Sequence, residues 1–371
     1  MNRFSFFEKF IFPVSLVISI TAFFSAIAPY VSPQKSWVLA FTGLGFPFIY
    51  TLNLFFLFFW IIKRKKLFII PLIPFLMGLK MVPTIVQIGN SGTKEIADPK
   101  TSLKIMSFNA RSFDLYNWLG NFTGKSKIRA RIFEMIKKES PDVVCFQEFY
   151  TCDSGKFQTV KIMMQDIGMH YAHVVLPVNL YRIDHWGMAT FSKYPLLNKS
   201  VIDFNHKGSN LCLYADMIAG NDTVRIYNCH LQSIRFGQED YKFMNQIGYN
   251  IEEENTNGIK KILSRLKIAF AKRALQADTV AANVRLSPYP VIFCGDFNDT
   301  PTSYSYKTLS ENLSDAFRES GNGLGTTYIG AFPAFRIDFI LHSPQIKSYD
   351  YTTIKQKLSD HYPITCNVNL H

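Results

Sequence analysis

Two long stretches without charged residues dominate the beginning of the chain. No Asp, Glu, Lys or Arg occurs between Lys9 and Lys35, and none occurs between Lys35 and Lys63. Each stretch exceeds the roughly 20 apolar residues that a helix needs to cross a bilayer, and both are rich in Phe and Ile. We therefore predict transmembrane helices near 11–30 and 38–62. A cleaved signal peptide could account for the first stretch but not for the second.

A third apolar stretch, 67–88, is interrupted by Lys80 and contains Pro71, Pro74 and Pro83. We predict a third span here, and a re-entrant segment is the alternative. In a span, Lys80 would lie toward the far end, where its long side chain can reach the membrane interface. Residues 1–90 are thus predicted to form a membrane anchor.

The basic loop "KRKK" at 63–66 gives the orientation of this anchor. Loops rich in Lys and Arg stay in the cytoplasm, which also suits Arg3 and Lys9. Three spans would place the chain after residue 90 outside the cytoplasm, whereas two spans would leave it inside. We expect a protein integral to the cytoplasmic membrane, with the remainder on the extracytoplasmic side.

The basic isoelectric point, about 9.3, does not by itself indicate a nucleic-acid partner. Residues 1–90 hold eight Lys or Arg and a single acidic residue, a net charge of +7. The rest of the chain has 32 basic and 27 acidic residues, which gives +5 of the total +12. More than half of the positive charge therefore belongs to the membrane-topology signal.

The six cysteines include no C-x-x-C pair, so a zinc cluster is not expected. Cys145, Cys229 and Cys294 lie in apolar runs typical of strands. We predict that they are small buried hydrophobic residues. An exported location would permit a disulfide, but the spacing does not identify one.

A polar linker at 91–102 precedes a globular region at 103–371. Strand-like runs such as 103–109 and 142–148 alternate there with helix-like runs such as 127–140. Many strands with few helices indicate two packed sheets with helices outside them. A unit of this length can enclose one large core.

Polar side chains recur where these predicted strands end. They are Asn109, Glu148, His230, Asp296, Asn298, Asp338, Asp360 and His361. The stretch "PVIFCGDFNDTP" at 290–301 shows the pattern, because four apolar residues lead directly into Gly295, Asp296 and Asn298. A surface turn is the alternative for this stretch taken alone, since Gly, Asp and Asn are ordinary turn residues. Many such strand ends in one chain favour a common site.

In chain order, "SFN", "QE", "GMATFSKYP", "CHLQ", "GDFND", "RIDFIL" and "SDHYPI" resemble motifs of the endonuclease/exonuclease/phosphatase superfamily. That group includes DNase I-like nucleases, apurinic-site endonucleases, neutral sphingomyelinases and inositol polyphosphate 5-phosphatases. The resemblance covers roughly 103–371 and leaves the membrane segments outside. It implies an α/β fold, a four-layer α/β/β/α sandwich of the DNase I-like type, with the site in the cleft between the sheet edges.

Phosphodiester hydrolysis requires neutralised phosphoryl oxygens, an activated water and a stabilised leaving group. Mg²⁺ prefers carboxylate and amide oxygens, and Mn²⁺ is an alternative. We predict Glu148 as the first metal ligand, with Asn109 beside it and Asp360 closing the site.

Asp296 and Asn298 lie two residues apart, so along an extended segment they face the same side. One of them can orient or deprotonate the attacking water while the other donates to a phosphoryl oxygen. His361 needs a partner to fix its tautomer and favour its charged form, and Asp338 would be that partner, as the resemblance also implies. His230 suits a donor to the phosphate or to the leaving oxygen.

Two further residues are candidate substrate contacts. Arg273 ends the basic helical segment 260–273, where it could touch substrate or orient loops. A solvated helix face is the favoured interpretation of Arg273. Tyr328 ends the sequence "GLGTTY", a predicted rim loop, and could stack on a substrate.

The expected function is that of a membrane-anchored, Mg²⁺-dependent phosphoesterase, nuclease-like, acting on phosphodiester or phosphomonoester bonds by metal-assisted in-line attack of water. An endonuclease or exonuclease would need a basic groove with aromatic residues. A lipid-headgroup phosphodiesterase or phosphatase would instead need an apolar rim beside the bilayer. The basic segment 260–273 could serve either substrate. The competing class is a non-catalytic membrane scaffold, which would be expected to lack some of these acids and histidines; no protein partner is predicted.

Overall fold

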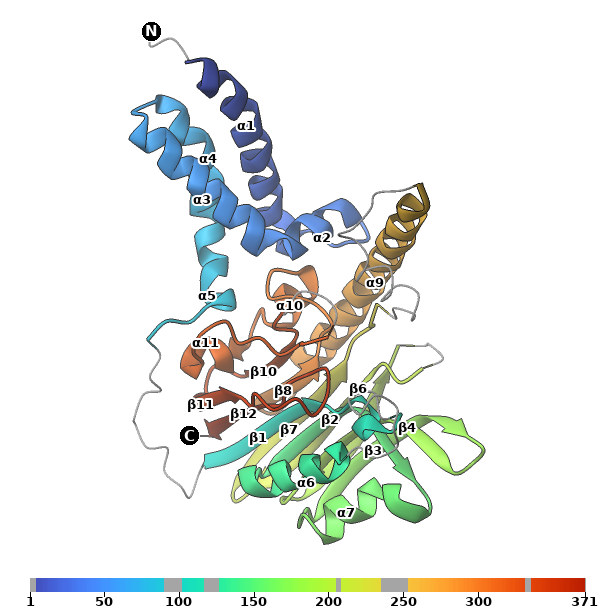
Figure 1. Ribbon diagram of the computed structural model, residues 1–371. Helices are drawn as coiled ribbons and strands as arrows, with labels where there is room; N and C mark the ends of the chain where they lie inside the picture. Colours follow the sequence, from blue (N-terminus) through green and yellow to red (C-terminus); the bar gives the residue numbers. More distant parts are fainter. Residues whose placement is uncertain are drawn as a thin grey trace.

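The N-terminal helices form a bundle above the two sheets in Figure 1. The computed structural model describes residues 5–89, 102–116, 127–204, 208–234, 253–330 and 335–370. The bundle contains the α-helices α1 (Phe6–Ile27), α2 (Trp37–Leu44), α3 (Phe46–Ile62), α4 (Ile69–Gly78) and α5 (Val82–Ile85), with the 3-10 turns η1 (Ala28–Tyr30), η2 (Lys66–Phe68) and η3 (Leu79–Met81).

Two helical stretches are long and apolar enough to cross a membrane, Phe6–Tyr30 and Lys66–Ile85. The helix predicted at 38–62 is instead two helices, α2 and α3, bent by 70°. Gly45 follows α2, and Pro47 lies in the first turn of α3, where its missing N–H leaves no helical bond unmade. The pair counts as a third candidate span only if the bend is included.

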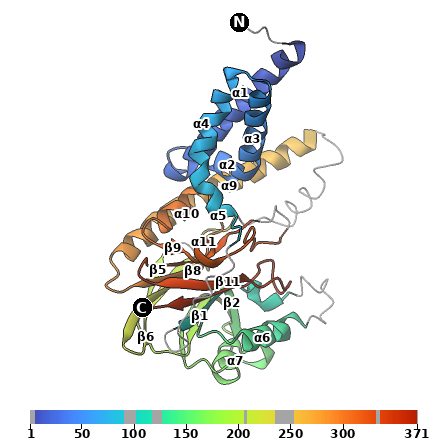
Figure 2. The same ribbon diagram turned by 90° about the vertical axis from the view of Figure 1, so that its left-hand side faces the viewer.

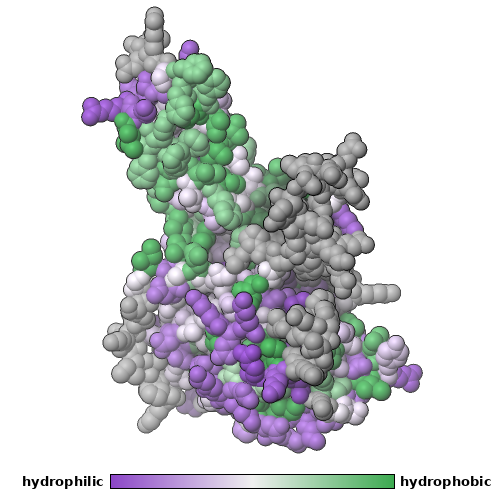
Figure 3. All heavy atoms as spheres, viewed as in Figure 1, coloured by the Kyte–Doolittle hydropathy of each residue, from purple (hydrophilic) through white to green (hydrophobic). Residues whose placement is uncertain are grey.

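The basic loop between α3 and α4 lies at the same end of the bundle as the start of α1 (Figure 1). Lys65 Nζ is 3.6 Å from the Glu8 carboxylate in the first turn of α1. Hydrophobic residues cover the bundle below this end (Figure 3), and Phe10, Phe55 and Leu76 are each more than half exposed. Such a continuous apolar surface is typical of helices that contact lipid.

The remainder of the described chain forms two six-stranded mixed sheets. The first has the order β11-β12-β1-β2-β4-β3. Its strands are β1 (Ser102–Asn109), β2 (Val143–Cys152), β3 (Tyr171–Leu180), β4 (Asp184–Ser192), β11 (Lys347–Thr353) and β12 (Ile364–Asn369). The second has the order β5-β6-β7-β8-β10-β9. Its strands are β5 (Leu196–Asp203), β6 (Leu211–Ala219), β7 (Asp222–His230), β8 (Val291–Asp296), β9 (Ser314–Asp315) and β10 (Asp338–His342).

Side-chain alternation along the strands divides the apolar residues between an inner core and two outer layers. On β1, Leu103 and Ile105 pack into the core between the sheets, whereas Met106 and Phe108 pack outward. Helices α6 (Ile128–Glu139) and α7 (Thr159–Gln165) cover the first sheet. Helices α9 (Glu253–Arg285) and α10 (Tyr304–Leu309) cover the second (Figures 1 and 2). The predicted four-layer sandwich is confirmed.

Three further short helices lie at the ends of strands: η4 (Arg111–Asp114), η5 (Gly155–Phe157) and α11 (Ala316–Ser320). The cysteines predicted to be buried, Cys145, Cys229 and Cys294, are fully buried in the core and in the layer below α9.

The bundle contacts the sandwich directly. The Phe41 ring of α2 packs edge-to-face on Phe270 of α9, with ring centroids 5.2 Å apart. Thr302 donates its hydroxyl hydrogen to the Gly43 carbonyl oxygen at 2.8 Å. A Cβ on Gly43 would lie 3.0 Å from the Thr302 carbonyl oxygen, so glycine permits this close approach.

A second contact joins the end of the bundle to the edge of the second sheet. Gln87 and Gly323 exchange two backbone hydrogen bonds of 2.9 and 2.8 Å. The buried Arg336 donates to the Thr84 carbonyl oxygen at 2.8 Å and forms an ion pair with Asp315 at 2.7 Å. Most of the linker predicted at 91–102 lies outside the described residues, and Ser102 begins β1.

Candidate functional site

Strand register brings polar side chains together at one end of the inner core. Four polar residues occupy strand positions that face the inner core by the alternation of side chains. They are Asn109 on β1, His230 on β7, Asp296 on β8 and Asp338 on β10. His230 lies opposite Asp296 in the parallel β7–β8 pair, and Asp338 lies opposite Asp296 in the antiparallel β8–β10 pair. Asp296 is therefore at the centre of the group.

Gly295 permits the close approach of the strands that carry His230 and Asp296. A Cβ at Gly295 would lie 2.3 Å from the carbonyl oxygen of Cys229, its partner on β7. No real Cβ is found that close to a carbonyl oxygen, so only glycine fits here.

Glu148 is positioned by an irregularity in β2. The pairing of β2 with β4 shifts register between Phe146 and Phe149, and Glu148 has a φ of 48°. Bulges of this kind redirect side chains and are common beside active sites. The bulge turns Glu148 out of the strand alternation and into the cavity that His361 also lines.

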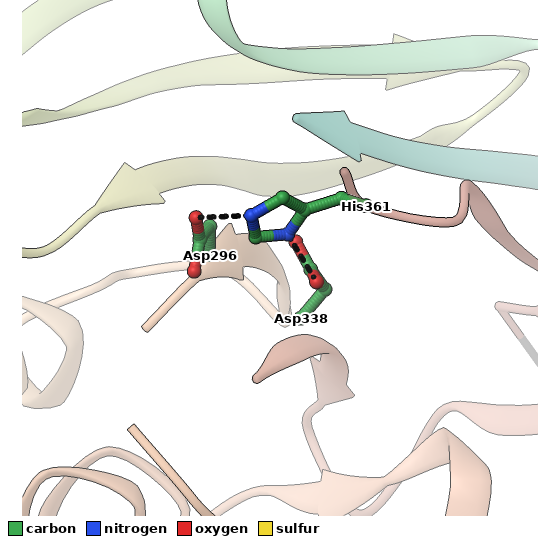
Figure 4. Close-up of side chains that lie close together, drawn as sticks. All are labelled: Asp296, Asp338 and His361. Atoms are coloured by element: carbon green, nitrogen blue, oxygen red, sulfur yellow. Dashed lines mark hydrogen bonds and ion pairs between the residues drawn. The ribbon is translucent and has the colours of Figure 1, made fainter. Parts of the chain in front are cut away.

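His361 lies between two carboxylates (Figure 4). Its Nδ1 is 2.9 Å from Asp338 Oδ2, and its Nε2 is 3.8 Å from Asp296 Oδ2. Burial alone would lower the pKa of His361, but Asp338 and Asp296 raise it well above its ordinary value. The imidazole is consequently held in its charged form, with Asp338 fixing its orientation.

Asp296 is fully buried and accepts hydrogen bonds from two neighbouring amides. Asn109 Nδ2 donates to Oδ2 at 2.9 Å, and the backbone N–H of Asn298 donates to Oδ1 at 2.8 Å. His230 Nε2 is 3.6 Å from Oδ2. Burial raises the pKa of Asp296, while the nearby His361 and His230 oppose that rise.

Asn109, Glu148 and Asp360 form a set of oxygen donors suited to a hard cation. Desolvation and then the charge of Asp360 raise the pKa of Glu148 to about 7, and a hydrogen bond from Asn109 opposes this rise. Two carboxylates that repel each other in a desolvated site are a common feature of cation sites, because a bound cation would relieve the repulsion. These residues therefore fit a divalent metal.

Asp296, Asp338 and His361 also present ligand atoms within 4.8 Å of one another. Their hydrogen bonding argues against a metal at that point, because His361 uses Nδ1 for Asp338 and its raised pKa keeps the ring protonated. A protonated imidazole has no lone pair for a metal. This group is therefore less suited to a metal than Asn109, Glu148 and Asp360.

The two candidate substrate contacts both line the cavity, but in different surroundings. Arg273 is 1% exposed, so the favoured interpretation of a solvated helix face is wrong for this residue. Its Nε donates to Asp299 at 3.0 Å and its Nη1 to the Gln232 carbonyl oxygen at 3.0 Å, which holds two loops together. The Tyr328 ring packs edge-to-face on His361 with centroids 5.2 Å apart.

One cavity of about 250 Å³ is lined by Glu148, Asp360 and His361, together with Asn298, Arg273 and Tyr328. Asn109, His230, Asp296 and Asp338 are buried and are not among its lining residues. Its polar side is lined by Arg111, Glu148, Ser233, Arg273, Asn298, Asp299, Thr300, Tyr328, Asp360 and His361. Its apolar side is lined by Leu44, Ile234, Leu266, Phe270, Phe335 and Ile337. Leu44 belongs to α2 of the N-terminal bundle, so that bundle forms part of the cavity wall.

Several contributing residues were not singled out from the sequence. Arg111 Nη1 is 3.5 Å from the Asp360 carboxylate, and Asp299, which reads as a turn residue, accepts from Arg273. Behind the site, Gln147 donates to the Asn228 side chain at 2.8 Å and joins the two sheets. Gln147 and Asp299 lie within the motifs "QE" and "GDFND", and Arg111 lies two residues after "SFN", so their position in or beside a motif is the sequence signal for them.

The sandwich is found in other solved structures. Solved structures with this fold include an endonuclease/exonuclease/phosphatase family protein from Bacteroides thetaiotaomicron, with a TM-score of 0.52, 16% identity and coverage of 73% of this chain and 98% of that chain. Another is the D. rerio TDP2 humanized by 14 mutations, with a TM-score of 0.50, 16% identity and coverage of 72% and 99%. At these identities the likeness shows the fold alone.

The sequence itself matches the Endonuclease/Exonuclease/phosphatase family over residues 106–361. This match spans more than half of the chain, and the protein belongs to that family. Members of the superfamily are hydrolases of phosphoester bonds. Residues 8–85 match a separate Domain of unknown function (DUF8431). No curated protein matches the chain.

Proposed function

We propose that this protein is a membrane-anchored, divalent-metal-dependent phosphoesterase that hydrolyses phosphodiester or phosphomonoester bonds with water. The observation that carries the proposal is the position of His361, which lines the cavity with Glu148 and lies 3.8 Å from the buried Asp296 and 2.9 Å from Asp338. Family membership supports the reaction class.

Glu148, Asp360 and Asn109 would hold the metal, with Mg²⁺ preferred and Mn²⁺ a substitute. When bound, the ion supplies positive charge that neutralises the phosphoryl group and the leaving oxygen. Arg111, paired with Asp360 at 3.5 Å, keeps that carboxylate turned toward the cavity.

The remaining residues bind the phosphate and move the proton. Asp296, fixed by Asn109 and Asn298, orients the attacking water and accepts its proton as the oxygen–phosphorus bond forms. The charged His361 donates to a non-bridging oxygen. His230 lies beside Asp296 and donates to the leaving oxygen as its bond to phosphorus breaks.

The assay for this proposal uses the full chain in detergent with bis(p-nitrophenyl) phosphate and Mg²⁺. We expect hydrolysis that stops with EDTA and falls by roughly 10²-fold or more in His361→Ala. The matched control is His170→Ala, because His170 is exposed. Hydrolysis that survives either EDTA or His361→Ala would contradict the mechanism.

We further propose that residues 1–90 are an anchor with three spans and that 103–371 form an extracytoplasmic catalytic domain. The basic loop between α3 and α4 lies at the end of the bundle opposite the sandwich (Figure 1), which supports this orientation. Alkaline phosphatase fused after residue 95 should then be active. The control is alkaline phosphatase fused to a known exported protein, which should be active. If that control is active and the fusion after residue 95 is inactive, the catalytic domain lies in the cytoplasm.

A further inference from the structure

The catalytic cavity has an apolar wall that none of the proposed chemistry uses. Leu266 and Phe270 of α9, 4% and 2% exposed, form this wall together with Leu44 of α2. Phosphoryl transfer needs charged and hydrogen-bonding groups, which Leu44, Leu266 and Phe270 do not have. Apolar residues lining a ligand cavity are expected to contact an apolar part of the ligand.

The apolar wall continues onto the surface of the two helices that build it. On α2, Phe41 packs on Phe270, and Trp37 is 40% exposed. On α9, Ile259 and Leu263 are 44% and 43% exposed toward the bundle end of the helix (Figure 1). Apolar residues therefore continue from the cavity along both helices, and α2 belongs to the bent pair that counts as a third candidate span.

The cations of the cavity are already committed to carboxylates. Within the described lining, Arg111 pairs with Asp360 at 3.5 Å and Arg273 pairs with Asp299 at 3.0 Å. A nucleic-acid strand would require a row of cations available to successive phosphates. This cavity instead combines polar lining residues suited to a single phosphate with the apolar Leu44, Leu266 and Phe270.

We propose that the substrate is an amphiphilic phosphoester of the membrane, a phospholipid whose apolar chain lies along Leu44, Leu266 and Phe270. This inference rests on the proposed phosphoesterase function and names its substrate class. The lipid phosphate would face Glu148 and His361, and the chain would extend past α2 toward the bilayer. The anchor thus contributes a residue to the substrate site and is more than a tether.

The test compares two chromogenic diesters with the same scissile bond, methyl and octyl p-nitrophenyl phosphate, hydrolysed by the full chain in lipid nanodiscs with Mg²⁺. We expect kcat/KM to be at least about 10-fold higher for the octyl ester, because each buried CH₂ contributes up to about 0.8 kcal/mol. Leu44→Asn and Phe270→Ser should reduce the octyl-to-methyl ratio toward 1. Leu275→Ser, on an exposed part of α9, is the matched control and should leave the ratio unchanged.

A second measurement separates the two proposals. Binding of octyl phosphate and methyl phosphate to the full chain, corrected with empty nanodiscs, reports the apolar subsite without any turnover. Hydrolysis of both esters at equal kcat/KM would overturn the lipid subsite and leave the phosphoesterase in place. Octyl-selective binding that is lost in Leu44→Asn, without hydrolysis of either ester, would support the subsite and contradict the phosphoesterase. Faster hydrolysis of single-stranded DNA than of the octyl ester would also overturn the lipid assignment.

Discussion

The imidazole of His361 and the carboxylate of Asp338 lie 2.9 Å apart, joined Nδ1 to Oδ2 across the end of β10. Because Nδ1 donates to Asp338, Nε2 is the nitrogen directed toward Asp296 and the cavity (Figure 4). This relationship makes the charge and the direction of the imidazole depend on a residue that does not itself line the cavity.

Asp338→Asn should lower kcat by roughly 10²-fold, because His361 loses the negative charge that keeps it protonated. The pKa of His361 should fall, so the alkaline limb of the rate profile should move to lower pH. Steady-state rates on bis(p-nitrophenyl) phosphate across the pH range measure both effects. Asp350→Asn, at an exposed position of β11, is the control. An unmoved alkaline limb in Asp338→Asn would show that Asp338 does not act through His361.

Glu148→Gln should raise the Mg²⁺ concentration needed for half-maximal activity by at least about 10-fold, since it removes a charged ligand. The same change should stabilise the protein in EDTA, because it relieves the repulsion between Glu148 and Asp360. Activity against Mg²⁺ concentration and thermal unfolding in EDTA give the two readouts. Glu134→Gln, exposed on α6, should change neither. A lower thermal midpoint for Glu148→Gln in EDTA would argue that Glu148 has a structural role.

Gly295→Ala should separate β7 from β8 at the site, because the new Cβ would lie 2.3 Å from the Cys229 carbonyl oxygen. We expect a destabilisation of about 1–3 kcal/mol, the usual effect of overpacking. The fall in kcat should be larger than the loss of folded protein explains, because His230 and Asp296 face each other across the β7–β8 pair. Thermal unfolding and kcat on the same samples measure the two losses, and wild-type values for both would contradict the close strand approach.

Glu319→Gln tests electrostatics away from the site. Partial burial opposes ionisation of Glu319, but hydrogen bonds from His342 and Ser348 outweigh it and lower its pKa from 4.5 to about 2. A lowered folded-state pKa adds stability that is complete above pH 4.5 and is lost as pH falls toward 2. Since the side chain is 37% exposed, we expect a difference of only about 1 kcal/mol at neutral pH. Thermal midpoints of the two proteins should converge on acidification, and a constant gap would contradict the ionic origin.

The sequence was sufficient for the sandwich because its signals are local. The alternation of side chains along β1, β7 and β8 places Asn109, His230 and Asp296 on the inner faces of the sheets. Each of these residues is the last of its strand, as the position of its motif after an apolar run predicts. The place of Leu44 in the cavity depends on contacts between segments more than 200 residues apart. The burial of Arg273 depends on its bonds to Gln232 and Asp299, 41 and 26 residues away along the chain. Periodicity within one segment contains no information on such contacts.

The hydrogen bonds of Thr84 with Arg336 and of Gln87 with Gly323, which join the bundle to the second sheet, have a kinetic consequence. A domain tied to a bilayer only through a flexible linker samples a hemisphere whose radius is the linker length, and encounters solutes and lipids alike. Here these hydrogen bonds would hold the cavity at a constant height above the membrane plane. Turnover should then follow the mole fraction of substrate in the surface, and diluting that surface with inert lipid should slow the reaction at constant bulk concentration.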